Sequence, residues 1–200
     1  MASNKGRVFT PIPLSEREAA ALVDAARTPS AKAIIVMLWR AGLRANELCS
    51  LEMDAVQFNE DGTSTVKVNN PKGLERGAPR RTIGLGKRST DVLLVWVRNR
   101  PEGFRRLYGP GPFFMTSKGN PLLTSQIRRT VSLAGKRAGL RRRVHPHCLR
   151  HTFASGMYDE GIGVKHIQAA LGHAKLKTTD AYLRDIGCDE VVDITRRREW

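Results

Sequence analysis

The chain has 200 residues, enough for one sizeable domain, and its 40% hydrophobic content is sufficient for a buried core. Lysine and arginine outnumber aspartate and glutamate by 34 to 19, and the formal charge of +15 favours a polyanionic partner, nucleic acid above all. The sequence contains no run of about 18 apolar residues, and its first residues lack the apolar core of a signal peptide, so we expect a cytoplasmic protein without a membrane partner.

Two helices are predicted after a polar, proline-containing arm at residues 1–13. Ser15 and Glu18 have the spacing of a capping box, which indicates that the first helix begins there. The second helix is predicted to begin at Ser30 and to end at Gly42 in a left-handed conformation, which brings Arg44 into a turn before the next short helix. An arginine at a helix entrance can face a phosphate. The apolar faces comprise Ala19, Leu22, Val23 and Ala26 in the first helix and Ile34, Met37, Leu38 and Ala41 in the second.

A β-hairpin is predicted at residues 63–69 and 80–85, because both segments are short and bounded by turn-forming residues. The loop between them holds Pro71, Lys72 and Gly73. A helix follows at residues 90–100 with Val92, Val95 and Trp96 directed inward, then a short strand at 112–115 and an amphipathic helix at 124–138. Further helices are predicted at 147–159, 164–171 and 178–183.

The second half of the chain places cationic side chains ahead of a single candidate tyrosine. The segment from His147 to His151 reads His-Cys-Leu-Arg-His, and Leu171-Gly172-His173 precedes Tyr182 by nine residues. His147 and Arg150 share one helix face, near a helix N-terminus whose backbone donors can also bind a phosphate. Together with Arg44 and Lys72, these residues suit attack on a phosphodiester. In that reaction the nonbridging phosphate oxygens are bound by guanidinium groups, the attacking phenol loses a proton and the departing alkoxide gains one.

These motifs, in this order, resemble the catalytic domain of the tyrosine recombinases, also called the phage integrase family. The resemblance extends from about Leu14 to Tyr182 and depends on the Gly-Leu-Arg-x-x-Glu-Leu segment at 42–48, the His-x-x-Arg-His segment and the spacing from His173 to Tyr182. It implies a mainly α fold with a small β-hairpin or sheet at one edge. It also implies a DNA-breaking and rejoining enzyme that needs neither a metal nor another cofactor.

The resemblance implies a role for each matching residue. Arg44 and Arg150 would clamp the nonbridging phosphate oxygens, and Glu47 would orient Arg44. His147 would take the position of the base, and His173 would reach the phosphate or support the nucleophile. Lys72, with Lys67 as the fallback, would protonate the leaving 5′-oxygen. Tyr182 would attack the phosphate and form a 3′-phosphotyrosyl link.

Three further features have alternative interpretations. His151 forms an i, i+4 pair with His147, as in zinc hydrolases, but the required glutamate is missing and Arg150 would repel a cation, so a supporting residue behind the site is favoured. Cys148 is interpreted as a packing residue rather than a nucleophile. The run Arg141-Arg142-Arg143 is either a solvated face or, as we expect from its place before His147, a segment that lies along DNA.

The expected organisation is an arm or linker remnant at 1–13, a catalytic domain at 14–184 and a tail at 185–200. The resemblance implies a double-stranded DNA partner, and a protein that is a monomer when free and a tetramer on DNA, with the tail exchanged between protomers. It also implies a protein encoded by a bacterium, an archaeon or a phage and associated with the nucleoid. Members of the family usually carry an additional N-terminal DNA-clamping domain, whereas this chain is expected to begin at the start of the catalytic domain, as a fragment or a naturally short relative. Two alternatives are a catalytically passive DNA-binding module and strand relaxation of the type IB topoisomerase kind.

Overall fold

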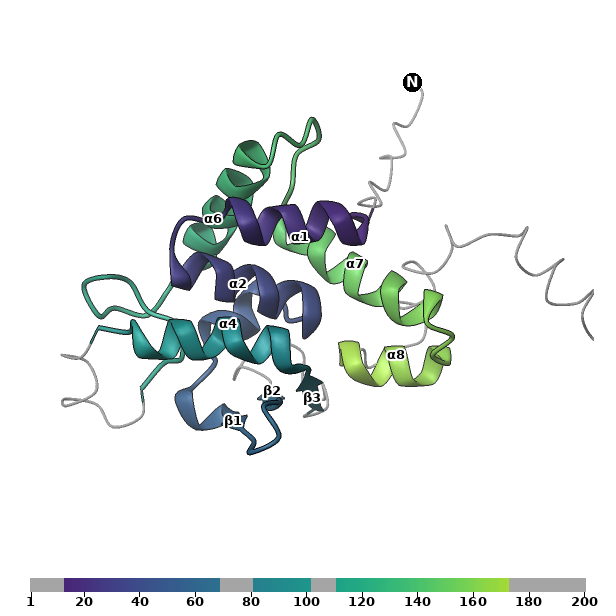
Figure 1. Cartoon of the computed structure of the whole chain (residues 1–200), viewed down its shortest axis with the longest axis horizontal. Helices are drawn as coiled ribbons and strands as arrows, with labels where there is room; N and C mark the ends of the chain where they lie inside the picture. The colour runs from purple at the N-terminus through teal and green to yellow at the C-terminus, as the bar shows by residue number, and fades with distance from the viewer. Residues whose placement is uncertain (1–12, 69–80, 102–110, 173–200) are drawn as a thin grey trace, which may run out of the picture.

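The computed structural model describes residues 13–68, 81–101 and 111–172. These residues form a helical body with a small sheet at one edge (Figure 1), as the sequence predicts. In chain order the helices of the described ranges are α1 (Glu16–Ala25), α2 (Pro29–Arg40), α3 (Ala45–Cys49), α4 (Lys87–Arg98), α6 (Thr124–Arg137), α7 (Pro146–Asp159) and α8 (Val164–Leu171). The strands are β1 (Val56–Phe58), β2 (Ser64–Val68) and β3 (Arg81–Leu85), and a 3₁₀ turn, η1 (Met53–Ala55), precedes them.

Helix α1 begins with the predicted capping box. The Ser15 hydroxyl accepts a hydrogen bond from the Glu18 backbone N–H at 3.2 Å, and the Glu18 carboxylate accepts one from the Ser15 N–H at 2.9 Å. Ala19 and Leu22 are fully buried, so the predicted apolar face packs into the core, against α2 and α6.

Helix α2 is the central helix of the fold. It begins at Pro29 rather than at Ser30, because the Thr28 hydroxyl caps it by accepting the Ala31 N–H at 3.2 Å and Pro29 occupies the first turn, where no N–H is needed. All residues from Ala33 to Trp39 are buried, so the helix is covered on every side, by α1, α4 and α7 among others.

The turn after α2 depends on glycine at position 42. Gly42 has a φ of 59°, as predicted, and a Cβ atom there would lie 2.3 Å from Cδ1 of Phe153 on α7. Only glycine combines this conformation with this close approach. The turn therefore brings Arg44, the residue immediately before α3, close to the start of α7.

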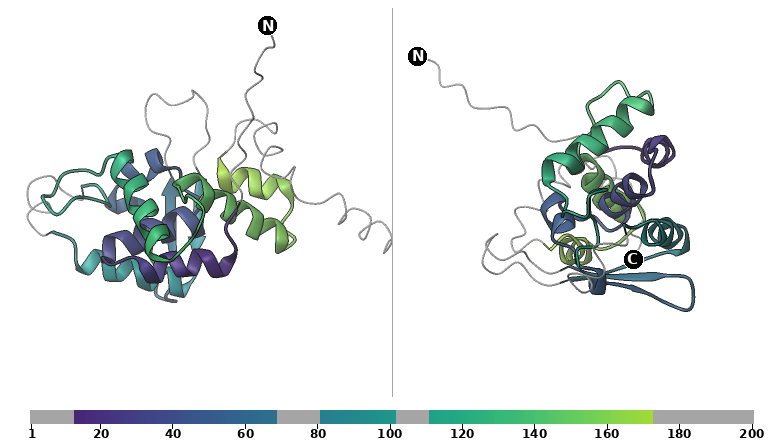
Figure 2. Two further views of the ribbon diagram at one scale, coloured as in Figure 1. Left: turned by 90° about the horizontal axis from the view of Figure 1, so that it is seen from above. Right: turned by 90° about the vertical axis from the view of Figure 1, so that its left-hand side faces the viewer.

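The sheet has three antiparallel strands in the order β1-β2-β3, with Val66 opposite Ile83 in the central pairing. It lies along one side of the helices (Figure 2, right). Strands β2 and β3 confirm the predicted hairpin, but β1 was not predicted, because it has three residues of which one is buried. The loop joining β2 to β3, with Lys72, lies outside the described residues.

Two predictions about the segment from 87 to 115 were wrong. In α4 the predicted inward positions of Val92 and Trp96 are confirmed, and Thr90 and Leu93 are buried with them. Val95 is instead 47% exposed, because the helical period places it on the opposite side from Leu93. Residues 112–115 form two isolated bridges, Glu52 to Pro112 and Met115 to Pro121, instead of a strand. Phe113, Phe114 and Met115 are nevertheless core residues, and the Trp96 indole donates to the Phe113 carbonyl at 3.0 Å.

Helices α6, α7 and α8 agree with the predicted segments to within one residue at each end. Helix α8 ends at Gly172, whose φ of 62° is left-handed. The helix predicted at 178–183 lies outside the described residues. Within the three described ranges, no helix is both long and apolar enough to cross a bilayer.

Candidate active site

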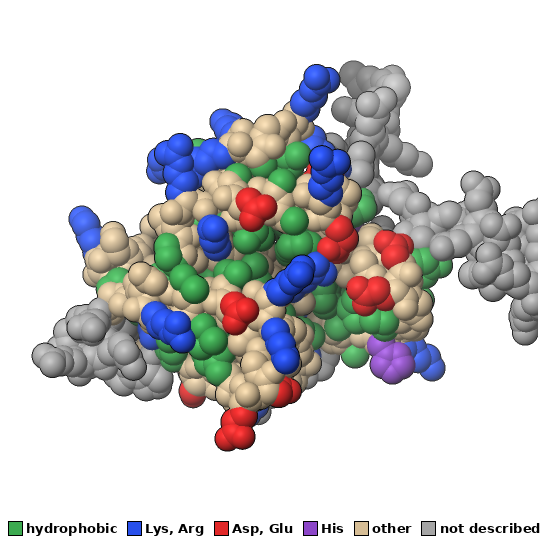
Figure 3. Space-filling view, in the orientation of Figure 1, with side chains coloured by type: hydrophobic (Ala, Val, Ile, Leu, Met, Phe, Trp, Pro, Cys, Tyr) green, Lys and Arg blue, Asp and Glu red, His purple; other side chains and the backbone are tan. Residues whose placement is uncertain are grey.

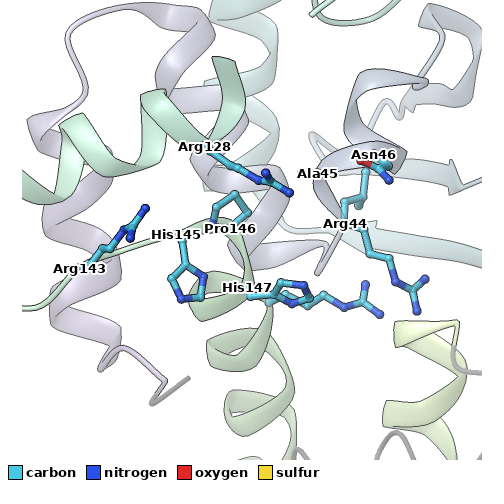
Figure 4. Close-up of a pocket in the computed structure, with 10 residues that line it drawn as sticks. Arg44, Ala45, Asn46, Arg128, Arg143, His145, Pro146 and His147 are labelled. Atoms are coloured by element: carbon cyan, nitrogen blue, oxygen red, sulfur yellow. The ribbon is translucent and has the colours of Figure 1, made fainter. Parts of the chain in front are cut away.

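A pocket of about 580 Å³ opens between the start of α3, helix α6 and the start of α7. Its lining includes four arginines and two histidines, namely Arg44, Arg128, Arg143, Arg150, His145 and His147 (Figure 4). No carboxylate belongs to the lining as far as the structure describes it. A cavity lined by cations without acidic side chains is suited to an anion.

Arg44 is held at the pocket wall by the first turn of α3. Its backbone N–H donates to one Glu47 carboxylate oxygen at 2.7 Å, and its Nη1 donates to the other at 2.9 Å. About a third of the side chain, 36%, stays exposed, so the guanidinium faces both its carboxylate and the pocket. This agrees with the expectation that Glu47 orients Arg44.

Arg150 is fixed more firmly, because its side chain is 1% exposed. Its Nη1 donates to the Gly42 carbonyl, and its Nη2 donates to the Leu171 carbonyl at 2.5 Å. A guanidinium has several N–H donors in one plane, so these two bonds set the plane of the group. Arg150 also ties the α2–α3 turn to the end of α8, immediately before His173 in the sequence.

Glu47 contacts three arginines rather than one. Its carboxylate is 5% exposed, receives two hydrogen bonds from Arg81 at 2.7 and 2.9 Å, and lies 3.9 Å from Arg150. Burial by itself would raise the pKa of Glu47, but the hydrogen bonds and charge of Arg81, with the Arg44 N–H and the Arg150 charge, lower this pKa to about 2. The carboxylate is therefore ionised and serves as the shared counter-charge of the site.

Arg81, the first residue of β3, is a site residue that the sequence reasoning missed. Its side chain is 7% exposed, and besides Glu47 it packs against Gly172, where a Cβ atom would lie 2.7 Å from its Nη1. Strand alternation could have identified it, because Arg81 shares a face with the buried Ile83 and Leu85, and an inward arginine requires a partner. Arg81 thus connects the sheet to α3 and to the end of α8.

His145 and His147 stand at the start of α7, with ring centroids 6.4 Å apart. The pKa of His147 is lowered from 6.5, first by partial desolvation in the pocket and then by the charges of Arg150, His145, Arg44 and Arg128. The pKa of His145 is lowered by desolvation and by the charge of Arg143. Both imidazoles are therefore mainly neutral at pH 7 in the unliganded pocket, so His147 can accept a proton.

The structure separates the three arginines before α7. Arg142 forms an ion pair with Glu18 of α1 at 2.5 Å, Arg141 is exposed outside the pocket, and Arg143 lines it. Their contact with DNA remains a prediction. Lys67, on the exposed side of β2, does not line the pocket.

His151 and Cys148 are buried in α7. Burial raises the pKa of the Cys148 thiol, which favours the unreactive protonated form and agrees with a packing role. Among the described side chains, no group of three or more histidines, cysteines, aspartates or glutamates could hold a metal ion.

The remaining predicted site residues, Lys72, His173 and Tyr182, lie outside the described residues, as does Cys188. Two described residues, Arg81 and Gly172, stand next to these segments in the sequence. Arg81 follows the loop of Lys72, and Gly172 precedes His173 in the sequence, so the structure brings together the ends of both segments.

Comparisons with known proteins agree with this geometry. The sequence pattern of the Phage integrase family matches residues 13–186. Similar curated proteins include Tyrosine recombinase XerC of Ralstonia pickettii (strain 12J), 30% identical over 183 residues that cover 86% of this chain and 56% of the relative. Another is Tyrosine recombinase XerC of Thermodesulfovibrio yellowstonii, 31% identical over 154 residues, 76% of this chain and 48% of the relative.

Among solved structures, the crystal structure of XerA recombinase superimposes with a TM-score of 0.80 at 28% identity, covering 97% of this chain and 68% of that one. The chain spans about half the length of the curated relatives that it matches.

Proposed function

The chain belongs to the phage integrase family, and we propose that it supplies the catalytic domain of a site-specific DNA recombinase that cuts and rejoins DNA through a phosphotyrosyl intermediate. The observation that carries this proposal is the convergence of Arg44, His147 and Arg150 on one pocket without carboxylates in its described lining. A phosphodiester is the anion that needs two guanidinium clamps together with a proton acceptor. In this proposal residues 14–184 are the catalytic domain, between an arm at 1–13 and a tail at 185–200.

The two arginines would bind the nonbridging oxygens of the scissile phosphate. Both are oriented before the substrate arrives, Arg44 by the Glu47 carboxylate and Arg150 by two backbone carbonyls. Donors that need not reorganise stabilise the charge that develops in the pentacoordinate transition state. The buried Glu47 keeps this cluster of cations stable without competing for the phosphate, since it does not line the pocket.

Tyr182 is the proposed nucleophile. Its phenol oxygen would attack phosphorus while the P–O5′ bond breaks, giving a 3′-phosphotyrosyl link and a free 5′-hydroxyl. His147, with its lowered pKa, would accept the phenolic proton, and Lys72 would donate one to the leaving 5′-oxygen. One phosphodiester replaces another, so a second 5′-hydroxyl can reverse the step and join a different strand.

The DNA partner is proposed on the same grounds, supported by the formal charge of +15. Strand exchange would require two duplexes, so we propose a monomer when free that assembles as a tetramer on DNA. Such a substrate would place the protein at the nucleoid of its host.

Covalent capture tests this function. The chain would be incubated in EDTA with nicked suicide duplexes of randomised sequence, and denaturing electrophoresis would detect a protein–DNA adduct. Wild type and Tyr158→Phe should form the adduct, and Tyr182→Phe should not. Tyr158 is the matched control because it is a partly buried tyrosine of α7 that does not line the pocket. An adduct at wild-type yield with Tyr182→Phe would disprove this nucleophile, and binding without any adduct would favour the passive DNA-binding module.

A further inference from the structure

The pocket extends beyond the three residues of the proposed chemistry. Its other wall consists of Arg128 from α6, Arg143 from the segment before α7 and His145 at the helix start, and these three are called the flanking group. Figure 4 shows Arg143 and His145 on one side of His147 and Arg44 on the other, with Arg128 above them. The lining therefore has two cationic ends that meet at His147.

Arg128 and Arg143 differ from Arg40 and Arg142 in how their charges are balanced. Arg40 and Arg142 pair with Glu16 and Glu18 at 2.7 and 2.5 Å, and acidic side chains accompany basic ones on the face in Figure 3. In the part of the chain that the structure describes, neither Arg128 nor Arg143 makes an ion pair. The charge of Arg143 instead acts on His145, and that of Arg128 on His147. The charges of Arg128 and Arg143 would attract an anion into the flanking group.

The size of the pocket exceeds the needs of a single phosphate. Its volume of about 580 Å³ is within the range of sites that hold a whole small molecule. The ring centroids of His145 and His147 lie 6.4 Å apart, so the two imidazoles stand at different points of the lining. Successive phosphates of one DNA strand advance by about 3.4 Å along the axis and also rotate around it, so they are separated by more than that rise.

We propose that Arg128, Arg143 and His145 form a second phosphate site, which binds the phosphate next to the scissile one on the same DNA strand. This inference builds on the proposed function. Phosphate contacts set the register and orientation of a protein on a strand. Two successive phosphates held at fixed positions would align the P–O5′ bond with the incoming tyrosine, so the flanking group acts on substrate position rather than on proton transfer.

The test uses thymidine 3′,5′-bisphosphate, whose two phosphates are one nucleoside apart, against thymidine 5′-monophosphate and inorganic pyrophosphate. Affinities would be measured by titration of the full chain at low salt. The wild type should bind the bisphosphate about tenfold more tightly than the monophosphate. The double variant Arg128→Met/Arg143→Met should reduce this preference to about twofold and leave pyrophosphate binding less affected.

The matched control is Arg129→Met/Arg137→Met, which removes the same charge from exposed positions of α6 outside the pocket. It should keep the tenfold preference. If both double variants lost the preference for the bisphosphate equally, the preference would come from general electrostatic attraction, and the second site would be refuted. A wild type that binds the bisphosphate and the monophosphate equally would also refute it. His145→Asn, which places a side chain favoured at helix N-caps before α7, should show an intermediate preference, and thermal unfolding would verify that each variant folds.

The two proposals can fail separately. A preference for the bisphosphate that depends on the flanking group, without covalent capture of DNA, would retain the second site and refute the cleavage function. Covalent capture without that preference would retain the function and refute the second site.

Discussion

Replacing Glu47 by glutamine tests whether a single carboxylate neutralises the buried arginines. The amide keeps the shape of the side chain but removes the charge that faces Arg81 and Arg150, whose side chains are 7% and 1% exposed. The fall in the pKa of Glu47 from 4.5 to about 2 corresponds to about 3 kcal/mol of stability. Breaking a buried ion pair from one side typically costs about 3–5 kcal/mol, in agreement with that value.

We therefore expect Glu47→Gln to lower the free energy of unfolding by about 3 kcal/mol and the melting temperature by about 6–12 °C at pH 7. The pKa of Glu47 is lower in the folded chain than in the unfolded chain. The stability that ionised Glu47 contributes is therefore fully present above pH 4.5 and is lost as the pH falls towards 2. The difference between wild type and variant should therefore narrow in acid.

Urea unfolding at several pH values would measure both effects. Glu60→Gln is the control, since Glu60 is an exposed carboxylate in the turn after β1. A Glu47→Gln variant as stable as Glu60→Gln at pH 7, or a difference that does not change with pH, would refute the role of Glu47 as the counter-charge.

Four other predictions concern the site and its supports. Arg150→Lys should slow formation of the covalent DNA adduct by about 10²- to 10³-fold, because lysine lacks the planar fork, and near-normal rates would argue against bidentate clamping. At subsaturating DNA, where the rate reports the free enzyme, the adduct rate should remain high as the pH falls to 6.5 and decline only below it, because the pKa of His147 is lowered in the unliganded pocket; a decline that begins above 6.5 under these conditions would contradict a neutral base. Gly42→Ala should destabilise the fold by about 2–4 kcal/mol in urea unfolding, through backbone strain and the clash with Phe153, whereas Gly139→Ala, at a φ of 74° with open space around it, should show the strain alone. DNA binding should weaken steeply with salt, with a slope of about −0.9 in log K per phosphate contact, and a flat response would exclude a backbone-binding surface.

Local signals explain why much of the fold could be predicted. The capping box at Ser15, the left-handed Gly42 and the bounds of α8 each depend on residues within about one helical turn of one another. The wrong predictions were those that tertiary contacts decide. The exposure of Val95 depends on where α2 packs against α4, and the three residues of β1 pair only because β2 is beside them.

The sequence by itself determined the chemical inventory, because the order and spacing of Arg44, His147 and Arg150 are properties of the chain. Only the tertiary structure decided how these charges are balanced. Arg81 lies 34 residues from Glu47 in sequence, and Arg142 pairs with Glu18 across 124 residues while its neighbour Arg143 lines the pocket. Ion pairing depends on distance in space and on burial, which no local pattern specifies. Only the folded chain therefore shows that Arg128 and Arg143 line the pocket without an ion pair in the described ranges, which is the basis for the second phosphate site.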